Sequence, residues 1–496
     1  MNKDETSYKQ IVKATSVFGG VQLLLIVVAI IKSKFVAILL GPAGIGIVGL
    51  FTTTLGLIAG LTNFGLKTSS VKNIAEANAS GDYKKVAFTI NVFRKLVWAT
   101  GILGSLVVLF SAQILSKYTF GNSDYTLSFI WLSITLLLNQ ISSGQIALLE
   151  GMRLLKPLAK ASLFGSIVGL FFSVPIYYIC GINGIVPVFI ITSCVSLFLS
   201  YWFTKNIKIE KVQLLTKDIA VEGKSMIIMG FLIGLTSILD NLIEYFTRIF
   251  IANHGDISMV GLFTAGFAIV NTYVGMIFSA MLIDYYPRLS AVAHDNKRSN
   301  NLINEQAEVA VVALGPLVIF FLVFIKLIIK TLYSDEFLLI DKMMYWAMLG
   351  ILIRAVNWSI GIIFLAKGAS KLYFSIYIFA FIVILTTNIG GYYFFGLEGL
   401  GIAFMVSNIL LTILGYGITR HLYSFSFTVG FVRVFLIQMV LSLLCFLNIL
   451  MIDKPWSYII GICLLMISLT YSYIQLDRRI DFKSAINNFK NKKNGK

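Results

Sequence analysis

Three charged residues stand four positions apart inside an apolar segment. Asp240, Glu244 and Arg248 all lie within residues 226–252. At about 3.6 residues per turn, this spacing places them on one face of a helix. A charge near the centre of a bilayer costs about 2.5–3.5 kcal/mol on insertion scales, so such side chains face protein or a water-filled cavity. The segment therefore predicts a polar pathway through a membrane protein.

These residues allow two kinds of chemistry. The planar guanidinium of Arg248 suits an anionic substrate, because it can donate two parallel hydrogen bonds. Glu244 and Arg248 are also an i,i+4 pair in the favourable order, so a purely structural ion pair stays open. Asp240 and Glu244 repel each other across one turn, and a proton or a sodium ion would relieve that repulsion. The two acids are therefore candidates for ion coupling.

Three further basic residues, Lys32, Lys34 and Arg354, lie inside apolar stretches. For the two lysines, contact with an anionic substrate and extension of the side chain to the membrane surface are both open. Arg354 is either a second substrate contact or one half of a structural pair. With Arg248, these residues form the predicted cationic set.

The composition places the chain in the membrane. Of its 496 residues 58% are hydrophobic and 13% are charged, and the mean hydropathy is +0.87. A soluble domain cannot bury so much apolar surface. The four cysteines include no C-x-x-C pair, and the three histidines are scattered. We therefore expect no disulfide, no metal site and no cofactor.

The apolar stretches divide the chain into fourteen predicted spans. They cover residues 11–39, 43–65, 89–112, 125–148, 157–179, 184–203, 225–252, 258–283, 306–330, 342–365, 371–394, 398–420, 428–451 and 456–476. With the N-terminus inside, cytoplasmic segments hold 31 of the 40 lysines and arginines. This asymmetry predicts that both termini are cytoplasmic. The basic tail, 477–496, is then expected on the membrane surface rather than on nucleic acid.

Two patterns recur at nearly constant distance. Val48-Gly49-Leu50-Phe51 returns as Val260-Gly261-Leu262-Phe263, and Tyr177-Tyr178-x-x-Gly181-x-x-Gly184 returns as Tyr392-Tyr393-x-x-Gly396-x-x-Gly399. Six spans separate the copies, so the halves share one orientation, as in parallel-repeat transporters. The predicted parts are an N-terminal lobe (1–203), a cytoplasmic linker (204–224), a C-terminal lobe (225–420), two extra spans (421–476) and the tail. Two such lobes predict a central cleft that opens alternately to each side.

Two pairs of glycines have the spacing that favours close helix packing. Gly56-x-x-x-Gly60 lies in the second span and Gly165-x-x-x-Gly169 in the fifth. Small residues at this spacing let two helix backbones approach each other. Rigid packing and packing that permits sliding are both open.

Three local patterns resemble those of a known family. They are Leu40-Gly41-Pro42-Ala43-Gly44-Ile45-Gly46 in the first hairpin, the acidic seventh span followed by Val260-Gly261-Leu262-Phe263, and Leu149-Glu150-Gly151-Met152-Arg153 after the fourth span. With two six-helix lobes plus two helices, the chain resembles polysaccharide flippases of the MATE-like, or MOP, exporter superfamily. The resemblance is greatest to O-antigen translocases of the Wzx type, and it covers nearly the whole chain.

The resemblance implies an all-α polytopic protein of the bacterial cytoplasmic membrane. Such a protein moves undecaprenyl-diphosphate-linked repeat units from the inner to the outer leaflet. Arg248, Lys34, Lys32 and Arg354 are then the expected headgroup-binding residues, and Asp240 and Glu244 are expected to couple transport to H+ or Na+. By analogy, a polysaccharide polymerase and glycosyltransferases are expected partners.

Other functions share part of this pattern. A lipid II flippase would also need cations, whereas a MATE-type drug exporter would favour an acidic cavity for its cationic substrates. A polysaccharide polymerase or ligase needs a sizeable outer loop, and here the outer loops are short and carry four lysines and no arginine. We therefore expect no enzyme activity. The phosphate-binding pattern G-x-x-x-x-G-K-[ST] does not occur, which argues against direct use of ATP.

Overall fold

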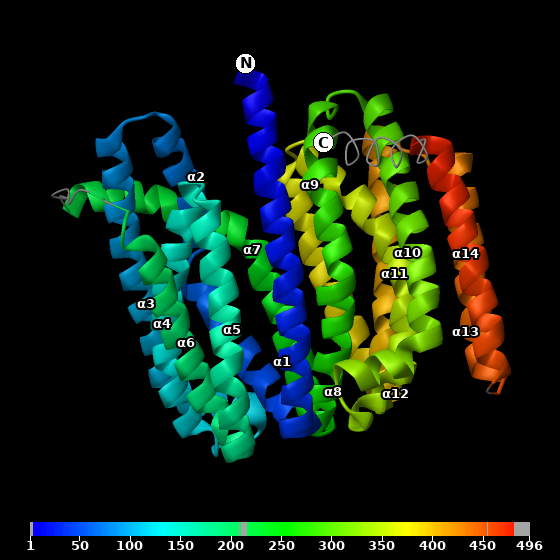
Figure 1. Ribbon diagram of the computed structural model, residues 1–496, viewed down its shortest axis with the longest axis horizontal. Coiled ribbons are helices and arrows are strands. Elements are labelled where there is room, and N and C mark those ends of the chain that lie inside the picture. Colours follow the sequence, from blue (N-terminus) through cyan, green and yellow to red (C-terminus); the bar gives the residue numbers. More distant parts are fainter. Residues whose placement is uncertain (1–2, 208, 210–215, 454, 481–496) are drawn as a thin grey trace, which may run out of the picture. The chain divides into compact units, whose positions relative to one another are not determined.

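The computed structural model describes residues 3–207, 209, 216–453 and 455–480, and these residues are arranged as helices without strands (Figure 1). The first seven helices are α1 (Lys3–Thr62), α2 (Leu66–Ala79), α3 (Tyr83–Phe120), α4 (Thr126–Gly151), α5 (Leu155–Cys180), α6 (Ile185–Thr204) and α7 (Thr216–His254). The others are α8 (Ile257–Ala268), α9 (Gly275–Ala291), α10 (Asn296–Leu332), α11 (Asp341–Ala366), α12 (Ser370–Tyr423), α13 (Val429–Met451) and α14 (Trp456–Ile480). A π-helix, Ile269–Val274, joins α8 to α9. The predicted all-α polytopic fold is confirmed.

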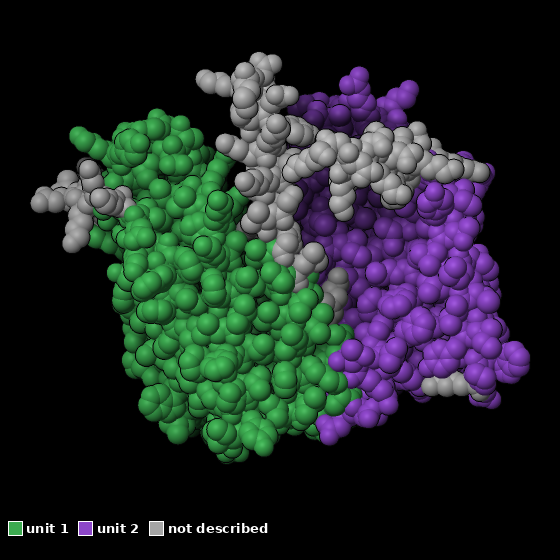
Figure 2. Space-filling model, in the orientation of Figure 1, with its two compact units in different colours: residues 1–261, 332–334 green, residues 262–331, 335–496 purple. Residues whose placement is uncertain are grey.

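The chain forms two compact units, coloured separately in Figure 2. Unit 1 is residues 1–261 with 332–334, and unit 2 is residues 262–331 with 335–496. Helix α7 belongs to unit 1, where it packs against α1, α2 and α3. The boundary between units thus differs from the predicted linker at 204–224, most of which lies outside the described residues or at the start of α7. The division into symmetric lobes stays a prediction.

Ten continuous helical stretches of the described residues are long and apolar enough to span a membrane, and a bent pair, Glu222–Phe231 with Ile233–His254, makes eleven. Three of the ten contain a sharp backbone change, at Gly41 in α1, Gly181 after α5 and Gly396 in α12. If each of these three stretches is counted as two spans, divided at its glycine, the eleven become the fourteen spans that the sequence predicts. The chain is a multi-pass membrane protein.

Two of these breaks have the same geometry. Gly181 has φ 54° and ψ −134°, and its repeat partner Gly396 has φ 59° and ψ −140°. These angles are accessible to glycine and strained for other residues. Three residues later, a Cβ on Gly184 or Gly399 would lie 3.0 or 1.8 Å from the carbonyl oxygen eight positions earlier. The second sequence repeat is therefore also a repeat of hairpin geometry.

The segments that the sequence predicts as connections between membrane spans are largely helical. Helix α2 occupies most of the segment between the second and third spans, and only four residues separate the end of α9 at Ala291 from the start of α10 at Asn296. Helix α2 buries Leu66, Ile74 and Ala77, so its apolar face packs on unit 1. Helix α3 begins early because Asp82 caps it, accepting hydrogen bonds from the amides of Lys84 and Lys85.

The two glycine pairs behave differently. A Cβ on Gly60 would lie 3.4 Å from Cγ1 of Ile238 in α7, so this pair does mark close packing of α1 on α7. In the second pair, a Cβ on Gly169 would lie 3.6 Å from Cγ2 of Thr192 in α6, whereas no atom lies within 4 Å of a Cβ on Gly165. The packing prediction for this pair is therefore confirmed at Gly169 and wrong at Gly165.

Within unit 2, a buried amide joins the last two helices to α10. Gln438 of α13 is fully buried, and its Oε1 accepts a hydrogen bond from Ser468 of α14 at 2.7 Å. Its Nε2 donates to Ser472 Oγ at 2.9 Å, and that hydroxyl donates to the carbonyl oxygen of Val312 in α10 at 2.8 Å. Hydrogen bonds between membrane helices stabilise their association by about 0.6–2 kcal/mol each. Helices α13 and α14 are therefore fixed to α10.

Candidate functional site

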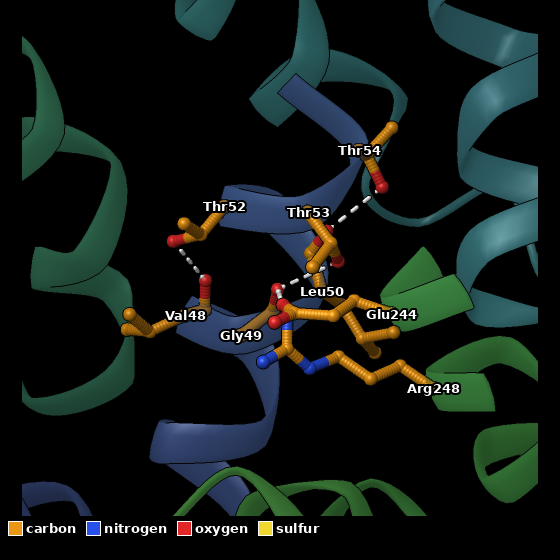
Figure 3. Close-up of polar contacts among 8 residues, drawn as sticks. All are labelled: Val48, Gly49, Leu50, Thr52, Thr53, Thr54, Glu244 and Arg248. Carbon is orange, nitrogen blue, oxygen red and sulfur yellow. Dashed lines mark hydrogen bonds and ion pairs between the residues drawn. The ribbon is translucent and has the colours of Figure 1, made fainter. Parts of the chain in front are cut away.

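Arg248 is buried between α7 and the second half of α1. Its residue is 8% exposed, whereas the Glu244 side chain is 47% exposed. Arg248 Nη1 lies 3.1 Å from Glu244 Oε2 and donates to the carbonyl oxygen of Gly49 at 3.4 Å (Figure 3). Within the described part of the chain its Nε has no hydrogen-bond partner. The guanidinium is thus fixed on one side and incompletely satisfied on another.

The predicted ion pair exists, and it is asymmetric. Glu244 and Asp240 are both exposed, one turn apart on α7, while Arg248 is enclosed. The sequence spacing therefore correctly placed Glu244 beside Arg248. Whether these residues bind substrate or couple ions stays a prediction.

A polar strip on α1, which the sequence reasoning missed, borders this pair. Thr53 Oγ1 donates to the carbonyl oxygen of Gly49 at 2.9 Å, so that oxygen has two donors, Thr53 and Arg248 (Figure 3). Thr54 Oγ1 lies 3.3 Å from Thr119 Oγ1, which is 3.5 Å from the hydroxyl of Tyr245 on α7. Three consecutive threonines, 52–54, in an otherwise apolar span were the available signal.

The two lysines of α1 lie before the break at Gly41, whereas Arg248 contacts the segment after it. Lys32 and Lys34 are both half-buried. Lys34 Nζ donates to the backbone carbonyl oxygen of Tyr333. Lys34 therefore has a structural partner, and its predicted role in headgroup binding remains a prediction, as does that of Lys32.

In unit 2, Arg354 of α11 meets the π-helix that joins α8 to α9. Arg354 Nη1 donates to Oδ1 of Asn271 at 3.1 Å. Its guanidinium carbon lies 5.5 and 5.8 Å from the ring centroids of Phe278 and Phe404, within the range of cation–π attraction. Short π-helical segments occur frequently at functional sites. Arg354 is thus a half-buried cation held by an amide and two aromatic rings.

Two of the three motifs that carried the family resemblance contact each other through residues 42, 46 and 261 of unit 1. Gly41 has φ 62° and ψ −171°, and Pro42 follows it inside α1. A Cβ on Gly261 would lie 1.8 Å from the carbonyl oxygen of Pro42, and a Cβ on Gly46 would lie 2.0 Å from that of Ile257. Only glycine permits such an approach of two backbones.

Comparison with protein families now decides the affiliation. Residues 35–341 match the family model described as polysaccharide biosynthesis protein. The chain belongs to this family. The match includes the Gly41–Pro42 break, α7 with Arg248, and the contact between α1 and α8, and it ends before Arg354. No curated protein matches the sequence of this family member.

Solved structures show the fold of this polysaccharide biosynthesis protein. The lipid II flippase MurJ, in an inward closed conformation, matches with a TM-score of 0.67 and 16% identity over 94% of this chain and 99% of that one. An inward-facing multidrug resistance MATE family transporter of the MOP superfamily gives 0.66 and 17% over 81% and 94%. A MOP superfamily transporter from Pyrococcus furiosus gives 0.57 and 16% over 83% and 94%. The resemblance to MOP superfamily transporters is confirmed.

Proposed function

We propose that this protein is a flippase that moves diphosphate-linked oligosaccharide repeat units, carried on undecaprenol, from the cytoplasmic to the outer leaflet by alternating access. The observation that carries the proposal is the buried, incompletely satisfied Arg248 in a polysaccharide biosynthesis protein with the fold of membrane transporters. A buried cation of this kind suits an anionic headgroup and not a cationic drug. The bacterial cytoplasmic membrane is the proposed location.

In this proposal the carboxylate of Glu244 occupies the position beside Arg248 that the substrate diphosphate takes when it binds. A buried arginine without a counter-ion is strongly destabilising, by about 3–5 kcal/mol where a buried pair is broken. Glu244 supplies the counter-ion in the present arrangement and is itself half exposed. A diphosphate that reaches Arg248 replaces the carboxylate, so that one charge-assisted contact is exchanged for another. The exchange therefore costs less than binding to an unpaired buried charge.

The same exchange provides a route to ion coupling. Once Glu244 leaves Arg248, it lies one turn from Asp240 with no cation from Arg248 to offset the repulsion. Uptake of H+ or Na+ by this pair of carboxylates then accompanies substrate binding. The proposal therefore assigns Asp240 and Glu244 to coupling, and Arg248, with Arg354, Lys34 and Lys32, to the headgroup.

Lipid analysis of a strain lacking the gene tests this function. Undecaprenyl-linked saccharides would be extracted, identified by mass spectrometry, and assigned to a leaflet by their accessibility to an added enzyme or label. We expect a completed repeat unit to accumulate on the cytoplasmic face. Accumulation of lipid II instead would support a second candidate function, a lipid II flippase. The likeness in fold to the lipid II flippase MurJ, over 94% of this chain, favours that candidate.

A third outcome would refute both lipid assignments. New sensitivity to cationic dyes, without accumulation of any lipid-linked saccharide, would identify a MATE-type exporter. Complementation of the strain with the intact gene and with the Arg248→Ala variant, matched for expression in the membrane, would tie the phenotype to this site.

A further inference from the structure

Unit 2 contains a polar pocket outside the sites of Arg248 and Arg354. It has a volume of about 370 Å³ and is lined by residues 296–304 of α10 and by residues 423–428, which include the linker between α12 and α13. Four of the lining side chains are asparagines, at 296, 300, 301 and 304. The pocket lies at the ends of three candidate membrane spans, Asn296–Leu332, Ser370–Tyr423 and Val429–Met451. It is therefore at the boundary between membrane and water.

Two of the asparagines hold the linker in place. Asn304 is 3% exposed, donates to the carbonyl oxygen of Ser426 at 3.0 Å and accepts from the amide of Thr428 at 2.8 Å. Asn300 donates to the carbonyl oxygen of Ser424 at 3.1 Å. These bonds define the wall of the pocket, and they engage the backbone carbonyl oxygens of Ser424 and Ser426.

A lysine engages one more acceptor at the rim. Lys367 Nζ donates to Oδ1 of Asn296 at 2.9 Å and lies 4.7 Å from the ring centroid of Tyr423. It also donates to the carbonyl oxygen of Ala293. The amide oxygen of Asn296 is thus occupied, whereas its NH2 group is left as a donor.

The groups that remain include one cation and several hydrogen-bond donors. Among the described residues, the ammonium of Lys297, the amide of Asn301 and the hydroxyl of Ser426 make no hydrogen bond or ion pair. Acidic groups occur nearby. Asp295, which precedes α10, is paired with Arg298 at 3.4 Å and accepts a hydrogen bond from its amide, while Glu305 and Glu308 lie on later turns of α10. The side-chain oxygens of Asn300 and Asn301 accept no hydrogen bond, but the only unpaired charge among the described lining residues is the ammonium of Lys297. A pocket with this free cation and free amide NH2 groups favours an anion with several oxygens.

We propose that this pocket binds the phosphate of an anionic headgroup at the membrane surface. Basic pockets between membrane helices are a recurrent way of holding such headgroups. Lys297 supplies the charge, and the amide of Asn301 and the hydroxyl of Ser426 supply hydrogen bonds to the phosphate oxygens. The site is independent of the transported substrate, so it does not rest on the proposed function.

Native mass spectrometry of the purified full-length protein tests the proposal. Adducts with phosphatidylglycerol would be compared with adducts of phosphatidylcholine for the wild type, Lys297→Gln and Asn301→Asp. Lys371→Gln is the matched control, because it removes one exposed lysine that does not line the pocket. Binding of inorganic phosphate, measured by calorimetry on the same samples, distinguishes a free phosphate from a lipid headgroup. Thermal melting confirms that each variant is folded.

We expect about a tenfold loss of phosphatidylglycerol adducts in Lys297→Gln, which corresponds to one charge-assisted hydrogen bond. Asn301→Asp should lose more, since it adds a negative charge without a change of size. The control should retain its adducts. Binding of inorganic phosphate that both variants abolish, without lipid adducts, would assign the same site to a soluble phosphate. Equal binding of both probes by the wild type, the two variants and the control would overturn the proposal.

Discussion

The guanidinium of Arg248 has two contacts and one buried donor without an acceptor among the described residues. One nitrogen, Nη1, serves both Glu244 and the carbonyl oxygen of Gly49, and Nε has no partner in the described part of the chain. A buried donor without an acceptor costs about 1–3 kcal/mol, and more when it is charged. A substrate oxygen at this position would therefore be favoured by the removal of an existing cost as well as by its own hydrogen bond.

Replacement of Arg248 by lysine tests whether the planar guanidinium is needed to bind the substrate diphosphate. Lysine keeps the charge but loses the planar fork, so Arg248→Lys should reduce transport by about tenfold to a hundredfold, the value of a charge-assisted hydrogen bond. The measurement is the rate of flipping of a lipid-linked saccharide in proteoliposomes. Arg420→Lys is the control, since Arg420 is exposed at the end of α12 and bonds to Tyr416 of its own helix. Equal rates for both variants would contradict the assigned role of Arg248.

Asp240 carries the prediction about coupling. Asp240→Asn removes one of the two neighbouring carboxylates, so transport should continue without dependence on an imposed H+ or Na+ gradient. Flipping would be measured in vesicles with and without each gradient. Asp284→Asn is a suitable control, because Asp284 is exposed and pairs with Arg288 on α9. If transport by Asp240→Asn still follows the gradient, coupling does not occur at this residue.

At the scale of elements, the contact between α1 and α8 depends on glycine. The α1 backbone changes direction at Gly41, and the carbonyl oxygen of Pro42 then meets Gly261 of α8. The two patterns are separated by about half the chain, yet no side chain fits between them. These small residues therefore fix the distance between two helices rather than the conformation of a turn.

Gly261→Ala should weaken this contact. A Cβ there would lie 1.8 Å from an oxygen atom, so the helices must separate, which we expect to cost about 1–3 kcal/mol, as overpacking does. Gly165→Ala is the matched control, because a Cβ there meets nothing within 4 Å and alanine favours a helix by up to about 1 kcal/mol. Thermal melting in detergent should show a lower midpoint for Gly261→Ala and an equal or higher one for Gly165→Ala. The opposite order would show that the contact does not contribute to stability.

At the scale of the whole molecule, the distribution of charge predicts the orientation in the membrane. Positively charged residues are concentrated at one set of helix ends, and the positive-inside rule predicts that these ends lie in the cytoplasm.

Cysteine labelling tests this orientation. In a chain without its four native cysteines, Ser123→Cys in the exposed segment between α3 and α4 should react with a membrane-impermeant maleimide applied to intact cells. Ala79→Cys at the exposed end of α2 should react only after the cells are opened. The reverse pattern would invert the topology and exclude transport in the proposed direction.

The sequence by itself determined the features that depend on composition and on near neighbours. Apolar length set the membrane helices, and the four-residue spacing placed Glu244 beside Arg248, because both are local properties of one helix. The second repeat aligns Gly181 with Gly396, and the structure gives these two glycines the same unusual dihedral angles. The family affiliation followed from motifs of this local kind.

Tertiary structure alone decided which distant groups meet. Arg248 reaches the carbonyl oxygen of Gly49, the threonine strip on α1 lies beside α7, and Asn304 fixes a linker more than a hundred residues away. Gly60 and Gly169 meet neighbouring helices, whereas Gly165, one turn before Gly169, meets nothing within 4 Å. Periodicity tells which residues share a helix face, but the partner of that face is chosen by packing between segments far apart in the chain, which the spacing of residues does not encode.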